Sequence, residues 1–222
     1  MSQLPRFVCR LSMAVVLLMS FTIYAEGADQ YPELPRLHQI SERLYRGGQP
    51  RPGGIRRLAE LGINTIINLR GANAQTRADE AEAKTLGLKY FNIPLPIWGR
   101  PNDSHVQRIL EIINAPESGR VFIHCRDGVD RTGMIVALHR IRSESWSSEK
   151  AIAEADRSGM RSHQYWMRDY IRDFYVWQQR EAANQKAHKS EFDDKIGVGV
   201  RVGERAVFRA KKSAVRFLED VF

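Results

Sequence analysis

The chain has 222 residues, of which 43% are hydrophobic, and this size and composition fit one globular domain with its own core. Basic residues exceed acidic ones, which gives a net charge of +8 and a sequence pI of about 9.7. A basic chain suits nucleic acid, anionic lipid or an anionic substrate. The sequence has neither a zinc-finger pattern nor a basic–aromatic RNA-binding motif, so we expect no nucleic-acid partner.

The first 25 residues have the pattern of a secretory signal peptide. Arg6 and Arg10 supply a positive segment, residues 11–23 are apolar with few interruptions, and Ala25 offers a small residue for cleavage. This apolar run is shorter than the roughly 18 residues that a helix needs to span a bilayer. We therefore expect an exported protein, periplasmic or secreted, with an uncleaved membrane anchor as the alternative.

Removal of residues 1–25 would also remove Cys9 and leave Cys125 as the only cysteine. The mature chain could then form no internal disulfide. A lone thiol in an exported protein favours a chemical role for Cys125 over a structural one.

Strand and helix patterns alternate along the next part of the chain, which we expect to form one domain over residues 26–182. The predicted elements are an extended lead-in (29–42), a short strand and turn (43–50), a helix (53–61), a strand (63–69), a helix (78–86), a strand (88–93) and a helix that Asp103 or Ser104 would cap and that ends at Asn114. This order predicts an α/β fold in which helices flank a mostly parallel central sheet. Such sheets bind ligands at the carboxyl ends of their strands.

One stretch between residues 121 and 133 has the pattern of a strand, a tight loop and a helix. An apolar run ends in His124 and Cys125, a turn with Gly128 inside it follows, and Arg131 precedes an apolar helical pattern. The loop N–H groups can point inward at one spot, and the helix start adds its positive dipole end. The sequence therefore predicts a cradle for a dianionic phosphate.

Side chains in this loop add chemistry to the cradle. We expect the phosphate to be bound by Arg126, Asp127, Gly128, Val129, Asp130 and Arg131. Arg131 can close the cradle with its two-pronged guanidinium. The positive field favours the thiolate of Cys125, which is placed for attack on phosphorus. Thr132 can donate a hydrogen bond to the sulfur, and His124 can orient the loop through a backbone hydrogen bond.

His124-Cys125, five further residues and Arg131-Thr132-Gly133 together resemble the signature loop of cysteine-dependent protein tyrosine phosphatases. The histidine and the Arg-Thr-Gly run disfavour two alternatives, an inert buried cysteine and a rhodanese-like sulfur-transfer loop. The string from Leu44 to Pro50 is similar to the start of the core in atypical dual-specificity phosphatases, and this resemblance extends over residues 40–177. With its export signal, the layout resembles TpbA-like periplasmic phosphatases. The resemblance implies a dual-specificity phosphatase-like fold and a phosphocysteine intermediate, with no metal ion or other cofactor.

The general acid is not settled by this resemblance. In the family an Asp is usually supplied by a loop upstream of the signature, but the matching position falls near Gly99. Asp103 is the nearest carboxylate, either as the acid or as a helix cap. Asp127 and Asp130 resemble residues in the loop of myotubularin-type phosphatases, in which the residue matching Asp130 has been considered as the acid. Asp127 could instead brace the loop.

The remainder of the chain reads as helical. A helix is predicted from Thr132 to Arg142, a second after Ser147 or Ser148, and a third from Ser162. One side of the third helix carries an aromatic stripe, which we expect to pack in the core, formed by Trp166, Tyr170, Phe174 and Trp177. Residues 183–222 form a basic extension. It could dock on the domain as a hairpin and helix, or its basic helix could contact a membrane surface or a partner.

These observations predict an exported protein phosphatase that hydrolyses phosphotyrosine, and also phosphoserine and phosphothreonine because the pocket is expected to be shallow. The expected partner is a phosphorylated protein. Two alternatives remain. One is a phosphoinositide phosphatase acting as a secreted effector on host lipids, in which Arg126 would face additional anionic groups. The other is a catalytically weak module that binds phosphorylated ligands, which the missing carboxylate at Gly99 motivates.

Overall fold

The structure is a computed structural model that describes residues 30–190 and residue 192. The predicted signal peptide, Cys9 and most of the predicted basic extension lie outside the described residues. The chain divides into two compact units. The first holds the residues up to Ile97 and Pro101–Thr132, and the second holds Trp98–Arg100 and the residues from Gly133 onward.

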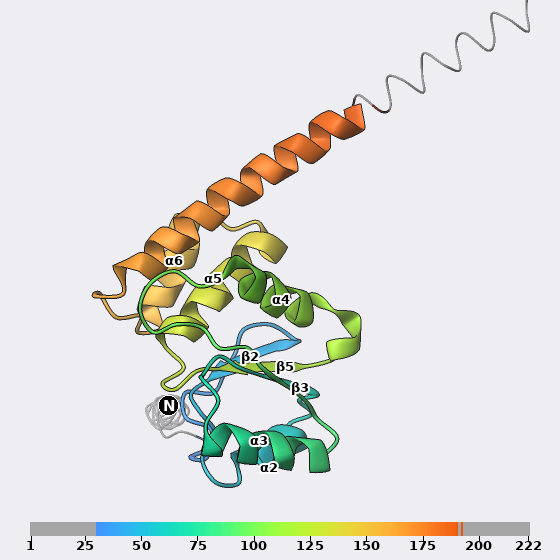
Figure 1. The fold of residues 1–222 in the computed structure, drawn as a ribbon, viewed down its shortest axis with the longest axis vertical. Coiled ribbons are helices and arrows are strands. Elements are labelled where there is room, and N and C mark those ends of the chain that lie inside the picture. The colour runs from blue at the N-terminus through green and yellow to red at the C-terminus, as the bar shows by residue number, and fades with distance from the viewer. Residues whose placement is uncertain (1–29, 191, 193–222) are drawn as a thin grey trace, which may run out of the picture. The chain divides into compact units, whose positions relative to one another are not determined.

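A five-stranded sheet in the order β1-β2-β5-β3-β4 forms the first unit (Figure 1). Its strands are β1 (His38–Gln39), β2 (Leu44–Gly47), β3 (Thr65–Asn68), β4 (Lys89–Asn92) and β5 (Val121–His124). The β1–β2 pairing is antiparallel and the other three pairings are parallel. The predicted α/β fold with a mostly parallel sheet is confirmed, and β1 is a short addition where only an extended lead-in was expected.

Helices cover both faces of this sheet. Helices α2 (Gly54–Glu60) and α3 (Ala74–Thr85) lie on one side, and α4 (Asp103–Asn114) lies on the other (Figure 1). Every residue of the central strands β3 and β5 is therefore buried. Strands covered on both faces read as continuous apolar runs rather than as alternating patterns. This explains why these two strands were recognisable from the sequence.

The start of α4 differs from the prediction. The side chain of Asn102 caps this helix, because its Oδ1 accepts a hydrogen bond from the N–H of Ser104 at 2.8 Å. The predicted cap, Asp103 or Ser104, is wrong. Asp103 is instead the first residue of the helix, where its negative charge lies at the positive end of the helix dipole.

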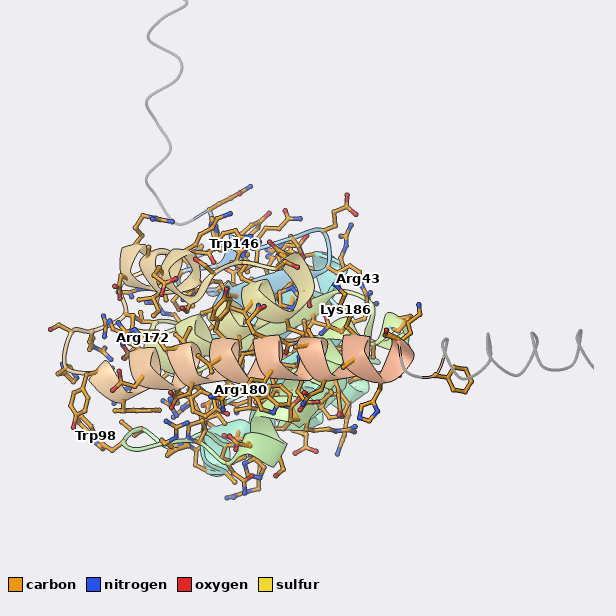
Figure 2. The ribbon with its side chains drawn as sticks, turned by 90° about the horizontal axis from the view of Figure 1, so that it is seen from above. Arg43, Trp98, Trp146, Arg172, Arg180 and Lys186 are labelled. Carbon is orange, nitrogen blue, oxygen red and sulfur yellow. The ribbon has the colours of Figure 1, made fainter. Side chains whose placement is uncertain are left out.

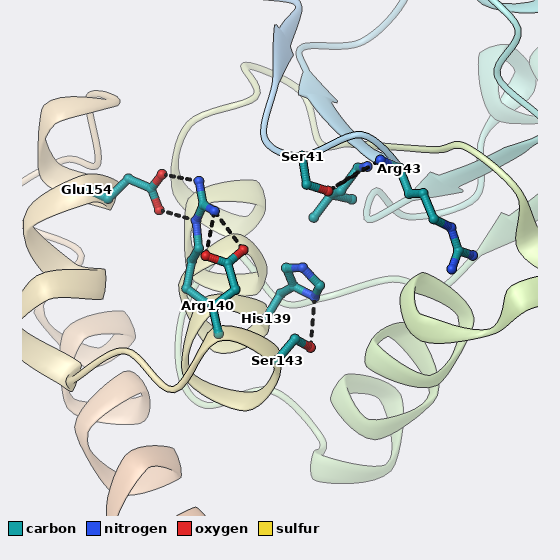
Figure 3. Close-up of polar contacts among 8 residues, drawn as sticks. Ser41, Arg43, His139, Arg140, Ser143 and Glu154 are labelled. Atoms are coloured by element: carbon teal, nitrogen blue, oxygen red, sulfur yellow. Dashed lines mark hydrogen bonds and ion pairs between the residues drawn. The ribbon is translucent and has the colours of Figure 1, made fainter.

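The second unit contains most of α5 (Asp130–Glu144), α6 (Ser148–Arg157) and a helix over residues 165–190. Arg140 pairs within α5 with Glu144, at 2.7 Å from its Nη1, and with Glu154 of α6, at 2.8 Å from its Nη2 (Figure 3). Its side chain is only 13% exposed, so water screens these pairs less than it would at the surface. The pair with Glu154 joins α5 to α6.

The aromatic stripe of the last helix is partly buried. Trp166, Tyr170 and Phe174 belong to the core, but Trp177 is 43% exposed, so its predicted burial is wrong. The helix also starts at residue 165, after a turn at Ser162. Among residues 30–190 and 192, no helix is both long and apolar enough to cross a membrane.

Candidate active site

The predicted signature loop, residues 125–131, lies at the carboxyl edge of the sheet. It follows β5, which pairs in parallel with β2 on one side and with β3 on the other. In this register His124 is opposite both Gly47 and Asn68. The loop then enters α5 at Asp130, so the positive end of that helix faces the loop. The structure thus brings the predicted strand, loop and helix start together.

Gly128 fixes the course of the loop. Its φ of +70° is a conformation that favours glycine, and a Cβ at this position would lie 2.4 Å from the carbonyl carbon and oxygen of Gly47. The turn after β2 therefore packs directly against the loop backbone. No other residue type fits here without moving one of the two backbones.

Two residues of the β2 segment hold the loop from outside. Arg46 is 3% exposed, and its Nη2 donates to the carbonyl of Gly128 at 2.8 Å. The N–H of Gln49 donates to the carbonyl of Arg126 at 3.0 Å. These two hydrogen bonds fix the carbonyls of Gly128 and Arg126 against the β2 segment. Sequence reasoning assigned no role to Arg46 or Gln49, although both belong to the string that resembles the phosphatase core.

Cys125 is a free thiol that is only 3% exposed. Thr132 lies in the first turn of α5 and is fully buried. Among the described residues, its Oγ1 has no hydrogen-bond partner. A buried hydroxyl without a partner is costly, and such groups often serve a function. The predicted hydrogen bond from this hydroxyl to the sulfur of Cys125 stays a prediction.

His124 is fully buried and stacks on Phe122, with ring centroids 5.6 Å apart. Burial lowers the pKa of His124 to about 4, and the positive charges of Arg70 and Arg131 contribute in the same direction. The imidazole is therefore neutral near pH 7. Its Nδ1 lies 3.1 Å from the carbonyl oxygen of Cys125, so Nδ1 carries the proton and donates to that carbonyl. This contact orients the peptide that follows Cys125.

Arg131 is tied to the adjacent strand end. Its Nη1 donates to the carbonyl of Leu69, just beyond β3, at 3.2 Å. The N–H of Leu69 in turn donates to the carbonyl of His124 at 2.9 Å. Leu69 thus joins the guanidinium to the start of the loop, which pre-organises Arg131 for a bidentate contact with phosphate.

The acidic residues differ in their surroundings. Asp130 is 7% exposed and stands at the first position of α5, next to Arg131. Asp127 is part of the loop surface, where its Oδ1 lies 3.9 Å from Nε of the exposed Arg126. Asp103 is exposed and lies at the start of α4, outside the loop. Of the two candidate acids, Asp130 is therefore the one that belongs to the signature loop.

The upstream loop, residues 94–103, has two kinds of attachment. In the first unit, the Nδ1 of His105 lies 3.3 Å from the carbonyl oxygen of Pro94. In the second unit, Arg100 pairs with Asp173 at 2.6 Å (Nη1 to Oδ2) and lies over the ring of Tyr170. Trp98, labelled in Figure 2, is 65% exposed and contacts His163 through its ring. Sequence reasoning did not find these contacts.

The loop residue Gly99 has a φ of +80°, and nothing lies within 4 Å of a Cβ placed there. A side chain at this position would therefore meet no steric obstacle, and only the backbone conformation favours glycine.

For the described residues, no group of three or more His, Cys, Asp and Glu is placed to hold a metal ion.

Comparisons with known proteins agree with this geometry. Residues 30–173 match a family model described as a DSP-PTPase phosphatase fused to NAD+ kinase. The dual specificity protein phosphatase TpbA of Pseudomonas aeruginosa is 28% identical over 124 residues, which cover 55% of this chain and 54% of that protein. The chain thus spans about half the length of the curated relatives that it matches first.

Solved structures show the same fold. PTPMT1 superposes with a TM-score of 0.56 at 23% identity and covers 67% of this chain and 99% of its own. The catalytic domain of the PP-IP phosphatase SIW14 from S. cerevisiae gives a TM-score of 0.55 at 19% identity, with 68% and 93% covered. The crystal structure of P. aeruginosa TpbA gives 0.53 at 23% identity, with 64% and 90% covered. These similarities confirm the dual-specificity phosphatase-like fold.

Proposed function

The chain belongs to the family of DSP-PTPase phosphatases described as fused to NAD+ kinase, and from this we propose that it hydrolyses phosphotyrosine in proteins, and also phosphoserine and phosphothreonine. The observation that carries the proposal is the constellation at the carboxyl end of β5. There a buried Cys125 heads a loop whose course is fixed at Gly128, and Arg131 is held beside it. A TpbA structure in complex with phosphotyrosine supports this choice of substrate.

The first step transfers the phosphoryl group to the enzyme. Sγ of Cys125 attacks phosphorus, so an S–P bond forms while the P–O bond to the leaving group breaks. Arg131 and the loop N–H groups bind the phosphoryl oxygens and stabilise the charge of the transition state. Asp130 donates a proton to the departing oxygen. Asp103 is the alternative acid.

The second step hydrolyses the phosphocysteine. Water attacks phosphorus, Asp130 accepts a proton from the water, and the S–P bond breaks to release inorganic phosphate and the thiolate. The buried hydroxyl of Thr132 can then donate a hydrogen bond to the thiolate, which makes the sulfur a better leaving group. The side chains of this site supply a nucleophile, an electrophilic clamp and a proton donor.

Turnover of a small substrate panel tests the proposal. The panel comprises p-nitrophenyl phosphate, a phosphotyrosine peptide, the same peptide with phosphothreonine, and vesicles with phosphoinositides. We expect turnover of the phosphotyrosine peptide and slower turnover of the phosphothreonine peptide. Binding of phosphate without turnover of any substrate would contradict the proposal and support a phospho-ligand-binding module instead.

A phosphoinositide is the second candidate substrate. Arg126 is exposed at the loop surface, where it could meet anionic groups beside the scissile phosphate. PTPMT1, which shares the fold, has been solved in complex with PI(5)P. Higher kcat/KM on phosphoinositide vesicles than on the phosphotyrosine peptide would favour this candidate.

We further propose that the protein is exported and that the basic extension over residues 183–222 contacts a membrane surface. Both proposals rest on the sequence pattern of the terminal segments. Mass spectrometry of the protein recovered from the periplasm or medium should show a new N-terminus between Ala25 and Asp29. An intact Met1 in a membrane fraction would instead support an anchor.

A further inference from the structure

The connection between β3 and α3 carries an arginine that the mechanism does not use (Figure 1). The backbone of Arg70 is held on both sides. Its N–H donates to Oδ1 of Asn68 at 2.9 Å, and its carbonyl accepts from Nδ2 of Asn92 at 2.7 Å. The Cα of Arg70 is therefore fixed at the carboxyl edge of the sheet, where the candidate site lies.

Arg70 immediately follows the residue that connects this edge to the signature loop. Leu69 accepts a hydrogen bond from Arg131 and donates one to the carbonyl of His124. Arg70 is thus the chain neighbour of the residue that Arg131 contacts. A ligand group bound at Arg70 would be close to a phosphate bound at Arg131.

The guanidinium of Arg70 is not occupied by the protein. Its residue is half-buried, and across residues 30–190 and 192 no hydrogen bond or ion pair engages its side chain. A cation that is held at the edge of a binding site without a protein counter-ion is suited to bind an anion from solution.

Asp79 is an acidic residue whose pKa the charge of Arg70 lowers, but its carboxylate is already hydrogen-bonded to other residues. Asp79 of α3 is 4% exposed, and its carboxylate accepts from Gln75 at 2.7 Å and from Gln49 at 3.4 Å. Burial raises the pKa of Asp79, while these hydrogen bonds and the charge of Arg70 oppose that rise. Tyr90 supplies no counter-ion, because burial raises the pKa of its phenol to about 12 and keeps it neutral near pH 7.

The charge of Arg70 also acts on His124, the last residue of β5. Together with Arg131 it lowers the pKa of His124, after the larger effect of burial. Two positive charges therefore act on the residue that precedes Cys125. The surface next to Arg70 is open, since Gly71 is exposed and a Cβ there would meet no atom within 4 Å. A ligand can approach from this side.

We propose that Arg70 binds a second phosphate group of the substrate, carried on the same small scaffold as the phosphate that Cys125 attacks. The proposal rests on the phosphatase function above and adds a determinant of specificity to it. A planar guanidinium can hold two oxygens of such a phosphate at once. Among phosphorylated polyols, a bisphosphate, either free in solution or as the head group of a lipid, is then preferred over a monophosphate.

Kinetics on matched substrates test the role of Arg70. The probes are inositol 4,5-bisphosphate, inositol 4-monophosphate and the bisphosphate head group in phosphatidylcholine vesicles, with p-nitrophenyl phosphate as the substrate that has one anionic group. Arg70→Ala should lower kcat/KM for the bisphosphate about tenfold more than for p-nitrophenyl phosphate, mainly through KM. Arg70→Lys should recover part of this loss because it keeps the charge but not the fork.

Arg77 supplies a matched control, because it is an exposed arginine on α3. Arg77→Ala changes the net charge by the same amount and should alter both substrates less than twofold. If Arg70→Ala lowered kcat/KM equally for both substrates, Arg70 would only support the loop and the proposal would be overturned. If Arg77→Ala reproduced the selective loss, a general effect of charge would replace the specific contact, and the proposal would again fail.

Binding measurements separate this proposal from the phosphatase function. In the Cys125→Ser background, calorimetry should show tighter binding of inositol bisphosphate than of the monophosphate, and Arg70→Ala should remove that difference. This readout does not require turnover, so a chain without phosphatase activity would still test Arg70. Equal binding of the two ligands in the Cys125→Ser protein would overturn the proposal. A preference for the vesicle over the free head group would identify a lipid as the source of the bisphosphate.

Discussion

The signature loop and the upstream loop differ in how they are held: the first by buried contacts, while the second carries exposed side chains. Buried contacts hold the signature loop: Gly128 packs on Gly47, and Nη2 of Arg46 donates to the carbonyls of Gly128 and Val129. In the upstream loop, Ile97 is 57% exposed and Trp98 is 65% exposed. A phosphate cradle must be rigid because its N–H groups have to be aimed before the substrate arrives. An exposed loop has no such requirement, and a glycine occupies the place of the expected acid.

The largest effect should come from the nucleophile of the rigid loop. Cys125→Ser should lower kcat on a phosphotyrosine peptide by at least about 10⁴-fold, because a neutral hydroxyl is a much weaker nucleophile than a thiolate. Phosphate binding should persist, since the N–H groups and Arg131 remain. Stopped assays and phosphate titration of the variant measure the two properties. Residual activity well above this level would show that Cys125 is not the nucleophile.

Substitution of the two candidate acids, Asp130 in the signature loop and Asp103 in the upstream loop, shows which of the loops supplies the proton. If the rigid loop supplies the acid, Asp130→Asn should lower turnover about 10²–10⁴-fold on an alkyl phosphate and less on p-nitrophenyl phosphate, whose leaving group needs little protonation. Asp103→Asn should then have a small effect. The rates of both variants on both substrates give the required ratios.

The pattern inverts if Asp103 is the acid, and the upstream loop would then share in catalysis. An Asp130 variant that loses both substrates equally would instead indicate a collapsed loop or lost binding. Phosphate affinity of Asp130→Asn separates these possibilities, because a collapsed cradle no longer binds phosphate.

The two left-handed glycines give a matched pair, one in each loop. Gly128→Ala should abolish detectable phosphate binding, because its Cβ would lie 2.4 Å from backbone atoms of Gly47. Gly99→Ala meets no steric obstacle and should cost only the left-handed backbone strain of about 1–2 kcal/mol. Thermal unfolding and phosphate titration compare the two variants. Similar losses in both would contradict the distinction between a rigid and an open loop.

The same contrast explains how much could be predicted from the sequence. The strand, loop and helix around Cys125 were predictable because their pattern is local: an apolar run, a glycine and a helix start are adjacent in the chain. The partners of the loop were not. Arg46 lies far from Gly128 in the sequence, and only the parallel pairing of β2 with β5 brings the two together. Long-range contacts of this kind leave no periodic signal.

Smaller errors also have physical causes. Asp103 and Ser104 are good capping residues, but Asn102 is equally suited and comes first in the chain, so it takes the cap. Trp177 continues the aromatic spacing of its helix, yet its exposure shows that the core ends before this residue. Periodicity indicates which face of a helix is apolar but not how far along the helix the core extends.

An effect of similar size concerns the pH dependence of stability, and it follows from the burial of His124. Burial keeps the pKa of His124 at about 4 in the folded chain, against roughly 6.5 in an unfolded one. Between these values the unfolded state binds more protons, so stability rises with pH over this window. The contribution of His124 should therefore fall by about 2 kcal/mol from pH 7 to pH 5.

The variant His124→Asn isolates this contribution, because asparagine does not titrate and its amide can still donate to the carbonyl of Cys125. Urea unfolding at pH 7 and pH 5 should show a smaller loss of stability in the variant than in the wild type. His139 is also buried and its pKa is also lowered, so His139→Asn removes the other histidine contribution. Equal losses in the wild type and His124→Asn would mean that the imidazole is not held neutral.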